Sequence, residues 1–78
     1  MTALHADQEL NCRGLSCPLP ILKTKKALDA LASGQVLRLI ATDPGSLNDM
    51  DAWMRSTGHT LLQAEQPRGE FVFYIQKK

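Results

Sequence analysis

Residues 36–42, Val-Leu-Arg-Leu-Ile-Ala-Thr, decide the fold of this chain. An almost unbroken apolar run of this length is typical of a central strand of a sheet. Asp43 and Pro44 follow directly and predict the start of a helix, with Asp43 as the N-cap and Pro44 in the first helical position. A buried strand that leads straight into a helix favours a layered sheet-and-helix architecture.

A similar strand–helix unit precedes the central strand. Residues 9–12 alternate polar and apolar side chains and predict a short half-buried strand, and Gly14 marks the turn that follows. Apolar side chains at helical spacing predict a helix that begins at Cys17-Pro18 and runs to about residue 32, where Ser33-Gly34 ends it. Residues 9–12 and 36–42 are therefore two successive strands, and each is followed by a helix.

A hairpin follows the second helix. Gly58 is expected to end that helix, and residues 60–65 predict a third strand. Residues 66–69, Gln-Pro-Arg-Gly, have the proline and glycine positions of a type I turn. Residues 70–76 alternate, so that Phe71, Phe73 and Ile75 share one face of a fourth strand.

The resulting order, βαβαββ, predicts an α+β fold. With right-handed crossovers it gives a two-layer α/β sandwich, a four-stranded mixed sheet with both helices on one face. We expect residues 1–6 to form a flexible N-terminal tail and residues 7–78 to form a single domain. The other sheet face should be partly solvated and available for interactions, with Arg38, Tyr74 and Gln76 among its residues.

Composition excludes several classes of protein. The chain has 78 residues and a formal net charge of +1, so its main work is not the neutralisation of phosphates. No apolar run is long enough to span a membrane, and the first seven residues do not resemble a secretory signal. Two cysteines are too few for a disulfide scaffold or, alone, for a zinc site. We therefore expect a small cytoplasmic domain whose thiols matter through reactivity.

Cys17 is the residue with the clearest chemical potential. It stands at the predicted entrance of the first helix, where free N–H groups and the helix dipole favour an anion such as a thiolate. Pro18 and Pro20 remove two of the first backbone donors, which leaves the N–H groups of Leu19 and Ile21 closest to the sulfur. The two prolines also stiffen the backbone at this point. The pattern predicts a reactive, exposed thiol.

Cys12 has two interpretations. It precedes Cys17 by five residues and shares a strand face with Leu10. It is either a resolving thiol, which forms a disulfide with Cys17, or a buried core thiol. The spacing is not that of a thioredoxin-type pair, and His5 and His59 are poor candidates for further zinc ligands.

Other polar residues also allow more than one interpretation. Lys23, Lys25 and Lys26 form either a solvated face or a docking patch for an acidic partner. His59 follows Gly58 at a helix end, where the dipole would suit a partly protonated imidazole. We expect His59 to be a cap or surface residue.

Three segments resemble a known family. Residues 10–20, Leu-Asn-Cys-Arg-Gly-Leu-Ser-Cys-Pro-Leu-Pro, with the basic segment 22–28, resemble the CPxP signature of the TusA/SirA sulfur-carrier family. Residues 41–46 with Asp49 resemble its second block, and Gly58-His59 resembles its third. The resemblance extends over about residues 9–77. One departure is the asparagine at position 11, where the family usually has aspartate.

The resemblance implies both a fold and a chemistry. The fold is a two-layer α/β sandwich, in agreement with the order of elements above. The chemistry is transfer of a sulfane sulfur, with Cys17 as the persulfide carrier and Pro18 and Pro20 shaping its site. Gly14 and Arg13 belong to the same turn and would help to shape it.

The resemblance also implies partners. The sulfur donor would be a cysteine desulfurase or a rhodanese-like protein, and the acceptor a further protein of tRNA 2-thiouridine synthesis, molybdenum-cofactor synthesis or sulfur oxidation. Such a chain is a carrier rather than a stand-alone turnover enzyme. We expect a monomer with no cofactor, no metal, no direct nucleic-acid contact and no membrane partner. The alternative is a redox-regulatory or protein-interaction module that uses Cys12 and Cys17 as a pair.

Overall fold

The computed structural model describes residues 6–16 and 19–78 of the chain. The tail expected at residues 1–6 therefore lies outside the described residues except for Ala6, and so do Cys17 and Pro18. In the order of the chain, the elements are β1 (Gln8–Cys12), α1 (Leu19–Asp29), β2 (Val36–Ala41), α2 (Ser46–Thr57), β3 (Thr60–Glu65), the short 3₁₀ turn η1 (Pro67–Gly69) and β4 (Phe71–Gln76). The predicted order βαβαββ is confirmed.

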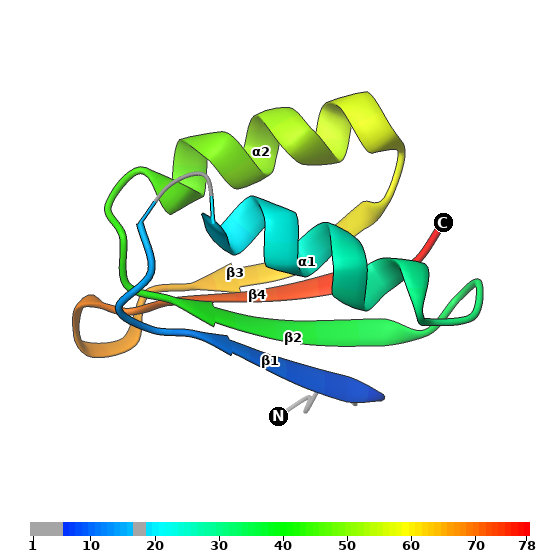
Figure 1. Cartoon of the computed structure of the whole chain (residues 1–78), viewed down its shortest axis with the longest axis horizontal. Helices are drawn as coiled ribbons and strands as arrows, with labels where there is room; N and C mark the ends of the chain where they lie inside the picture. Colours follow the sequence, from blue (N-terminus) through cyan, green and yellow to red (C-terminus); the bar gives the residue numbers. More distant parts are fainter. Residues whose placement is uncertain (1–5, 17–18) are drawn as a thin grey trace.

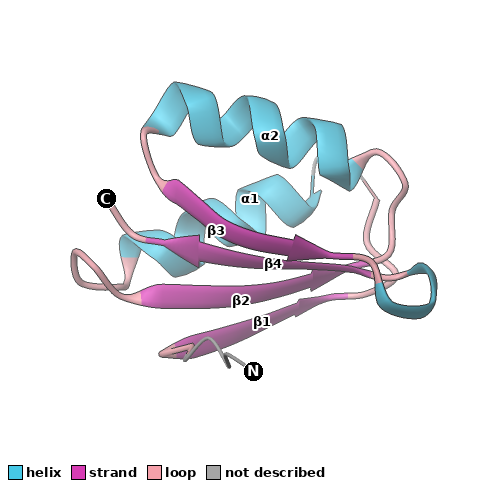
Figure 2. Cartoon of the chain, turned by 180° about the vertical axis from the view of Figure 1, so that it is seen from behind, coloured by secondary structure: helices cyan, strands magenta, loops and turns pink. Residues whose placement is uncertain are grey.

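The four strands form one mixed sheet in the order β1-β2-β4-β3. β1 and β2 are parallel, and β4 runs antiparallel to both β2 and β3. Both helices cover the same face of the sheet, as Figure 1 shows, and Figure 2 shows the opposite face from behind. The predicted α+β sandwich is therefore confirmed, with β2 and β4 as the two central strands.

The core lies between the sheet and the helices. Alternate residues of the two central strands point into it, and Leu39 and Phe73 are directly paired across β2 and β4. Helices α1 and α2 supply Leu28 and Met50. All four of these side chains are fully buried, as the alternation of apolar residues in the sequence predicts.

The open face of the sheet is tied together by polar side chains. Arg38 on β2 forms an ion pair with Glu9 on β1 and donates a hydrogen bond to the Tyr74 hydroxyl at 3.2 Å. Ile40 and Val72 are paired on this face and are almost fully buried. At its centre, the face that the sequence predicts to be partly solvated is therefore more deeply buried than expected.

The boundaries of the helices differ from the predictions in two places. α2 begins at Ser46 with Gly45 as its N-cap, and no side chain caps it, so the prediction of Asp43 as N-cap was wrong. Pro44 and Gly45 form a turn before the first helical residue, which places Asp43 too early to cap. α1 ends at Asp29 rather than near residue 32, because the next two N–H groups bond to carbonyls three residues back and tighten the chain.

The β3–β4 hairpin turns one residue later than predicted. The N–H of Glu70 donates to the carbonyl of Pro67 at 3.0 Å, which makes Arg68 and Gly69 the central residues. Their φ angles are 52° and 81°, both positive as in a type I′ turn. The predicted type I turn over residues 66–69 was wrong, because a primed turn matches the twist of the two flanking strands.

Candidate functional site

The loop from β1 to α1 is fixed by hydrogen bonds on both sides. The N–H of Arg13 donates to the Asn11 side-chain oxygen at 2.9 Å, and the N–H of Leu15 donates to the Cys12 carbonyl at 3.2 Å. The N–H of Gly14 donates to the Thr42 hydroxyl at 2.9 Å. Asn11 therefore forms the side-chain contact to the turn backbone that short polar residues commonly make there.

The contact with Thr42 joins two segments that are far apart in the sequence. Thr42 follows β2, and Gly14 follows the neighbouring parallel strand β1, so both loops leave the same edge of the sheet. The first and second blocks singled out in the sequence therefore meet at this edge. The role of Thr42 as the acceptor was missed, although the residue lies within the second block.

Arg13 is held by a partner from the end of the chain. Its guanidinium donates two hydrogen bonds to the Glu70 carboxylate, and the Nη2 contact is 3.1 Å. This hydrogen bonding lowers the pKa of Glu70 below its ordinary value and raises the pKa of Arg13. The pair bridges β1 and β4 across the end of β2 and stiffens the loop from its exposed side. Sequence reasoning missed Glu70, because 57 positions separate it from Arg13.

The start of α1 is defined by Leu19 and Pro20. The N–H of Leu19 donates to the Ser16 carbonyl at 2.9 Å, so this N–H has a backbone partner and is not the free donor expected from the sequence. Pro20 is fully buried, and its carbonyl accepts a 2.6 Å hydrogen bond from the buried Thr24 hydroxyl. The first turn of α1 is therefore anchored in the core at Pro20, while Ser16 and Leu19 are exposed.

The electrostatics of this helix start favour an anion. No acidic residue lies in the first turn of α1, so nothing there offsets the positive end of the helix dipole. Cys17 and Pro18 themselves lie outside the described residues. Their described neighbours in the sequence, Ser16 and Leu19, are joined to each other by the hydrogen bond described above.

Cys12 is a buried thiol at the end of β1. Its side chain has no exposed area and belongs to the core cluster, with Leu10 packed against that cluster. Burial raises the pKa of the Cys12 thiol, and the charge of Lys23 opposes this shift only in part. The raised pKa favours the protonated thiol, and together with full burial this fits the interpretation of Cys12 as a core thiol.

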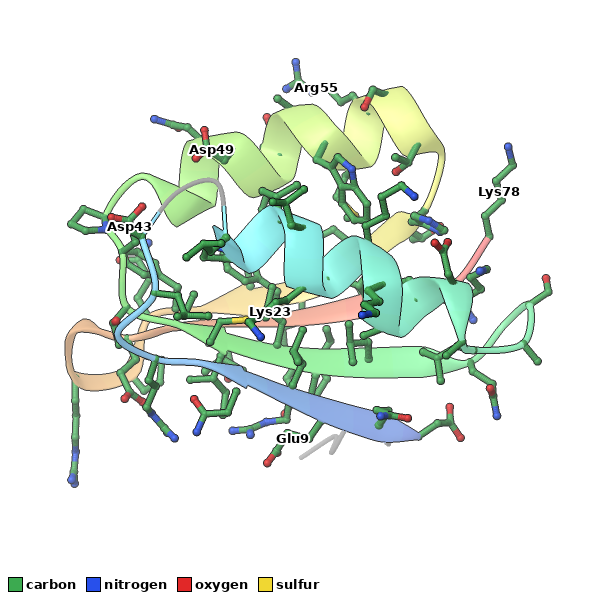
Figure 3. All side chains as sticks on the ribbon, in the orientation of Figure 1. Glu9, Lys23, Asp43, Asp49, Arg55 and Lys78 are labelled. Atoms are coloured by element: carbon green, nitrogen blue, oxygen red, sulfur yellow. The ribbon has the colours of Figure 1, made fainter. Side chains whose placement is uncertain are left out.

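Two carboxylates lie close to Gly45 at the start of α2. A side chain at Gly45 would begin 3.2 Å from an Asp43 oxygen and 3.8 Å from an Asp49 oxygen. Figure 3 labels both aspartates at the end of the molecule where α2 begins. A larger residue at position 45 would therefore require a small shift of the Asp43 side chain. This position belongs to the second block, at the same edge as the β1–α1 loop.

His59 lies at the other end of α2, far from this edge. Its Nδ1 accepts a 3.0 Å hydrogen bond from the N–H of Lys78, and its ring lies 5.6 Å from the ring of Trp53. Burial, and next the charge of Lys77, lower the pKa of His59, while Asp29 acts in the opposite direction. The accepted hydrogen bond and the lowered pKa both favour a neutral imidazole, so the helix dipole does not dominate here. His59 is a half-buried residue that binds the backbone of Lys78, in place of the cap or surface residue that the sequence predicted.

The state of His59 gives a pH prediction. A folded-state pKa below the ordinary value of 6.5 means that the unfolded chain binds a proton at His59 more readily than the folded chain. The free energy of unfolding is therefore expected to be fully developed above about pH 6.5 and to fall as the pH drops through the folded-state pKa. Urea unfolding between about pH 5.5 and 8, followed by the fluorescence of Trp53, measures this slope. The variant His59→Gln should have a flatter slope, and an unchanged slope would contradict the assignment.

The described residues offer no cavity for a large ligand. No pocket is formed within residues 6–16 and 19–78, and in the same ranges no three His, Cys, Asp or Glu side chains group as metal ligands. Among the described helices, none combines the length and apolar character needed to cross a membrane.

Comparisons with known proteins agree with the sequence motifs. The family model described as sulfurtransferase TusA matches residues 8–77. The sulfur carrier protein TusA of Allochromatium vinosum is 55% identical over 71 residues, which cover 91% of this chain and 93% of that protein. The sulfur carrier protein TusA of Pseudomonas putida is 37% identical over 78 residues, covering 100% of this chain and 98% of that protein.

A solved structure supports the fold. The crystal structure of a SirA-like protein from Desulfitobacterium hafniense superposes with a TM-score of 0.78, at 21% sequence identity. The superposition covers 88% of this chain and 95% of that one. At this identity the likeness concerns the fold alone, while the family model and the curated relatives bear on the sequence. The chain belongs to the TusA family of sulfurtransferases.

Proposed function

We propose that this chain is a sulfur carrier, in which Cys17 accepts a sulfane sulfur as a persulfide and passes it to another protein. The observation that carries this proposal is the structure around the start of α1, which lies next to Cys17 in the sequence. The β1–α1 loop is pinned through Gly14 and Arg13, and α1 begins at Leu19 with no acidic residue in its first turn. A thiol at such a helix start is acidified, because the positive end of the dipole stabilises its thiolate.

The transfer step needs only a thiolate and an approachable donor. The Cys17 thiolate attacks the outer sulfur of the donor persulfide, the sulfur–sulfur bond of the donor breaks, and the donor thiolate leaves. Cys17 then carries the persulfide, and the donor has been reduced to a thiol. The second transfer repeats this reaction with an acceptor thiolate as the attacking group. The absence of a pocket among the described residues is compatible with this chemistry.

The proposed partners are those that the family resemblance implies. The donor is a cysteine desulfurase or a rhodanese-like protein, and the acceptor is a protein of tRNA 2-thiouridine synthesis, molybdenum-cofactor synthesis or sulfur oxidation. We assign the carrier role to one domain, residues 7–78, which acts in the cytoplasm as a monomer. This assignment makes Pro18 and Pro20 shaping residues of the site, and the buried Pro20 fits that role.

The alternative redox pair has less support. The Cys12 thiol is fully buried, which hinders its attack by an oxidant or a partner thiol from solvent. The raised pKa of Cys12 also leaves little thiolate for disulfide exchange. Persulfide transfer through Cys17 does not depend on Cys12.

Intact-protein mass spectrometry tests the proposed function. The purified chain is incubated with a cysteine desulfurase and cysteine, or with inorganic polysulfide, and then weighed. We expect one added mass of about 32 Da, a single sulfur atom, which dithiothreitol removes. A chain that takes up no sulfur from either source would refute the carrier role.

Gly14→Ala tests whether the shape of the loop matters. Gly14 has a φ of 79°, and none of the described residues places an atom within 4 Å of an added Cβ, so the expected cost is backbone strain of about 1–2 kcal/mol. Gly34→Ala is the matched control, since its φ of 89° and open surroundings predict a similar loss of stability at the opposite end of α1. We expect slower loading of Cys17 by several-fold in Gly14→Ala only. Equal loading rates in the two variants would show that the loop does not shape the site.

A further inference from the structure

The exposed side of α1 carries two leucines and two lysines in one stripe. Leu19, Leu22, Lys23 and Lys26 are spaced i, i+3, i+4 and i+7, so they share one face of the helix, and we call them the α1 stripe. Leu19 is 44% exposed and Leu22 is 56% exposed, and both lysines are exposed. The buried residues of α1 lie on the opposite face: Pro20, Thr24 and Leu28.

The leucines of the stripe stand out among the side chains whose burial the structure describes. Leu19 and Leu22 are two of the three large hydrophobic ones that are exposed there. The third is Leu62, on the edge strand β3. Single exposed leucines are common on protein surfaces, but two adjacent ones on a helix form the start of an apolar contact area.

The two lysines of the stripe form no ion pair with any other residue that the structure describes. Lys25, which lies off the stripe, forms an ion pair with Asp29 at 3.4 Å. Within the part of the chain that the structure describes, Lys23 and Lys26 form no such pair. The whole chain carries a net charge of only +1, so the positive charge of the stripe is a local feature.

We propose that the α1 stripe docks a partner protein of sulfur transfer that presents acidic side chains around an exposed apolar one. This inference rests on the proposed function, because the stripe begins two residues after Cys17 and any protein that exchanges sulfur there must approach the first turn of α1. The two leucines supply apolar contact, and the two lysines supply charge complementarity and steering.

Two other occupants fit the stripe less well. A nucleic acid would use aromatic stacking platforms beside basic side chains, and the stripe has aliphatic leucines instead. A second copy of the chain related by two-fold symmetry would bring the lysines of one stripe toward those of the other. An acidic partner protein satisfies both the leucines and the lysines.

Photo-crosslinking in cells of the organism that naturally produces the protein tests this docking. Leu22 is replaced by p-benzoylphenylalanine in the full chain, and the same replacement at Leu62 is the matched control at an exposed leucine. We expect Leu22 to link to a different protein at about ten times the yield of Leu62, through a peptide with more acidic than basic residues. Adding Lys26→Glu should reduce the yield about fivefold, whereas adding Lys25→Glu, an equal charge change next to it, should not.

Four other outcomes would each overturn the docking proposal. Two concern the yield and the partner: equal yields at Leu22 and Leu62, or a link to a second copy or to RNA. Two concern charge: a basic partner peptide, or equal effects of the two lysine changes. Loading of Cys17 by inorganic polysulfide is measured in parallel on the purified chain. A failure to load would refute the proposed function, whereas the crosslinking pattern alone decides the docking.

Discussion

Replacing Cys17 by serine is expected to abolish sulfur loading while leaving the fold intact. A serine hydroxyl cannot form a persulfide, and it is not ionised at neutral pH as a helix-start thiol is. Thiol-to-hydroxyl replacement changes little in volume, and the neighbours Ser16 and Leu19 are exposed. We therefore expect the loaded fraction to fall below detection, with less than about 0.5 kcal/mol of lost stability.

Cys12→Ala is the matched control for the other cysteine. Because Cys12 is fully buried in the core, this change should lower the free energy of unfolding by about 1 kcal/mol and leave the loading of Cys17 unchanged. Loading is measured by intact mass at a temperature where both variants are folded. If Cys17→Ser still takes up sulfur, or if Cys12→Ala loses it, the site is not at Cys17.

Phe73→Ala is expected to have the largest effect on stability. Phe73 is fully buried in the central strand β4, is paired with Leu39 across to β2, and belongs to the single core between the sheet and the helices. Removing a buried phenyl ring costs about 3–5 kcal/mol. A domain of this length has a total stability of roughly 4–12 kcal/mol, so the variant should be close to unfolding.

Thermal and urea unfolding measure this loss. The melting temperature should fall by at least about 12 °C, given 4–8 °C per kcal/mol for a domain of this size. Leu62→Ala is the control, because Leu62 is 40% exposed on an edge strand and should change stability by less than about 0.5 kcal/mol. Similar losses of stability in the two variants would show that the core is not centred on the buried side chains around Phe73.

The regular alternation of the strands made most of the fold predictable. The apolar run that includes Leu37 and Leu39 and the alternation of Phe71, Phe73 and Ile75 both placed their residues on the faces where the structure has them. These signals are local and strong, because burial of one strand face selects apolar side chains at alternate positions. The end of α2 at Gly58 was equally predictable, since its φ of 83° suits glycine.

Competing local signals caused the errors. In the hairpin, Pro67 favours a type I turn, but Arg68 and Gly69 adopt positive φ because the strand twist prefers a primed turn. At α2, Asp43 is a good N-cap residue by type, yet the helix begins only at Ser46. A single sequence gives the preference of each residue and not which preference the tertiary structure overrides.

The helix start next to Cys17 was predictable, but the residues that support its loop were not. The motif predicted a helix entrance at Cys17-Pro18, and the structure describes α1 from Leu19 onward. The supports provided by Thr42 and Glu70 were not predictable, because each comes from a distant segment and neither forms a spacing pattern with Arg13 or Gly14. Sequence periodicity reports local faces, whereas contacts of this kind depend on which loops share a sheet edge.

Tandem mass spectrometry of the sulfur-loaded chain is the most direct test of the account. After brief loading with polysulfide at neutral pH, the chain is digested without reductant, and the fragment that carries the extra sulfur is sequenced. We expect the whole of the added mass on Cys17 and none on the buried Cys12. Added sulfur on Cys12, or an even distribution over both thiols, would contradict it.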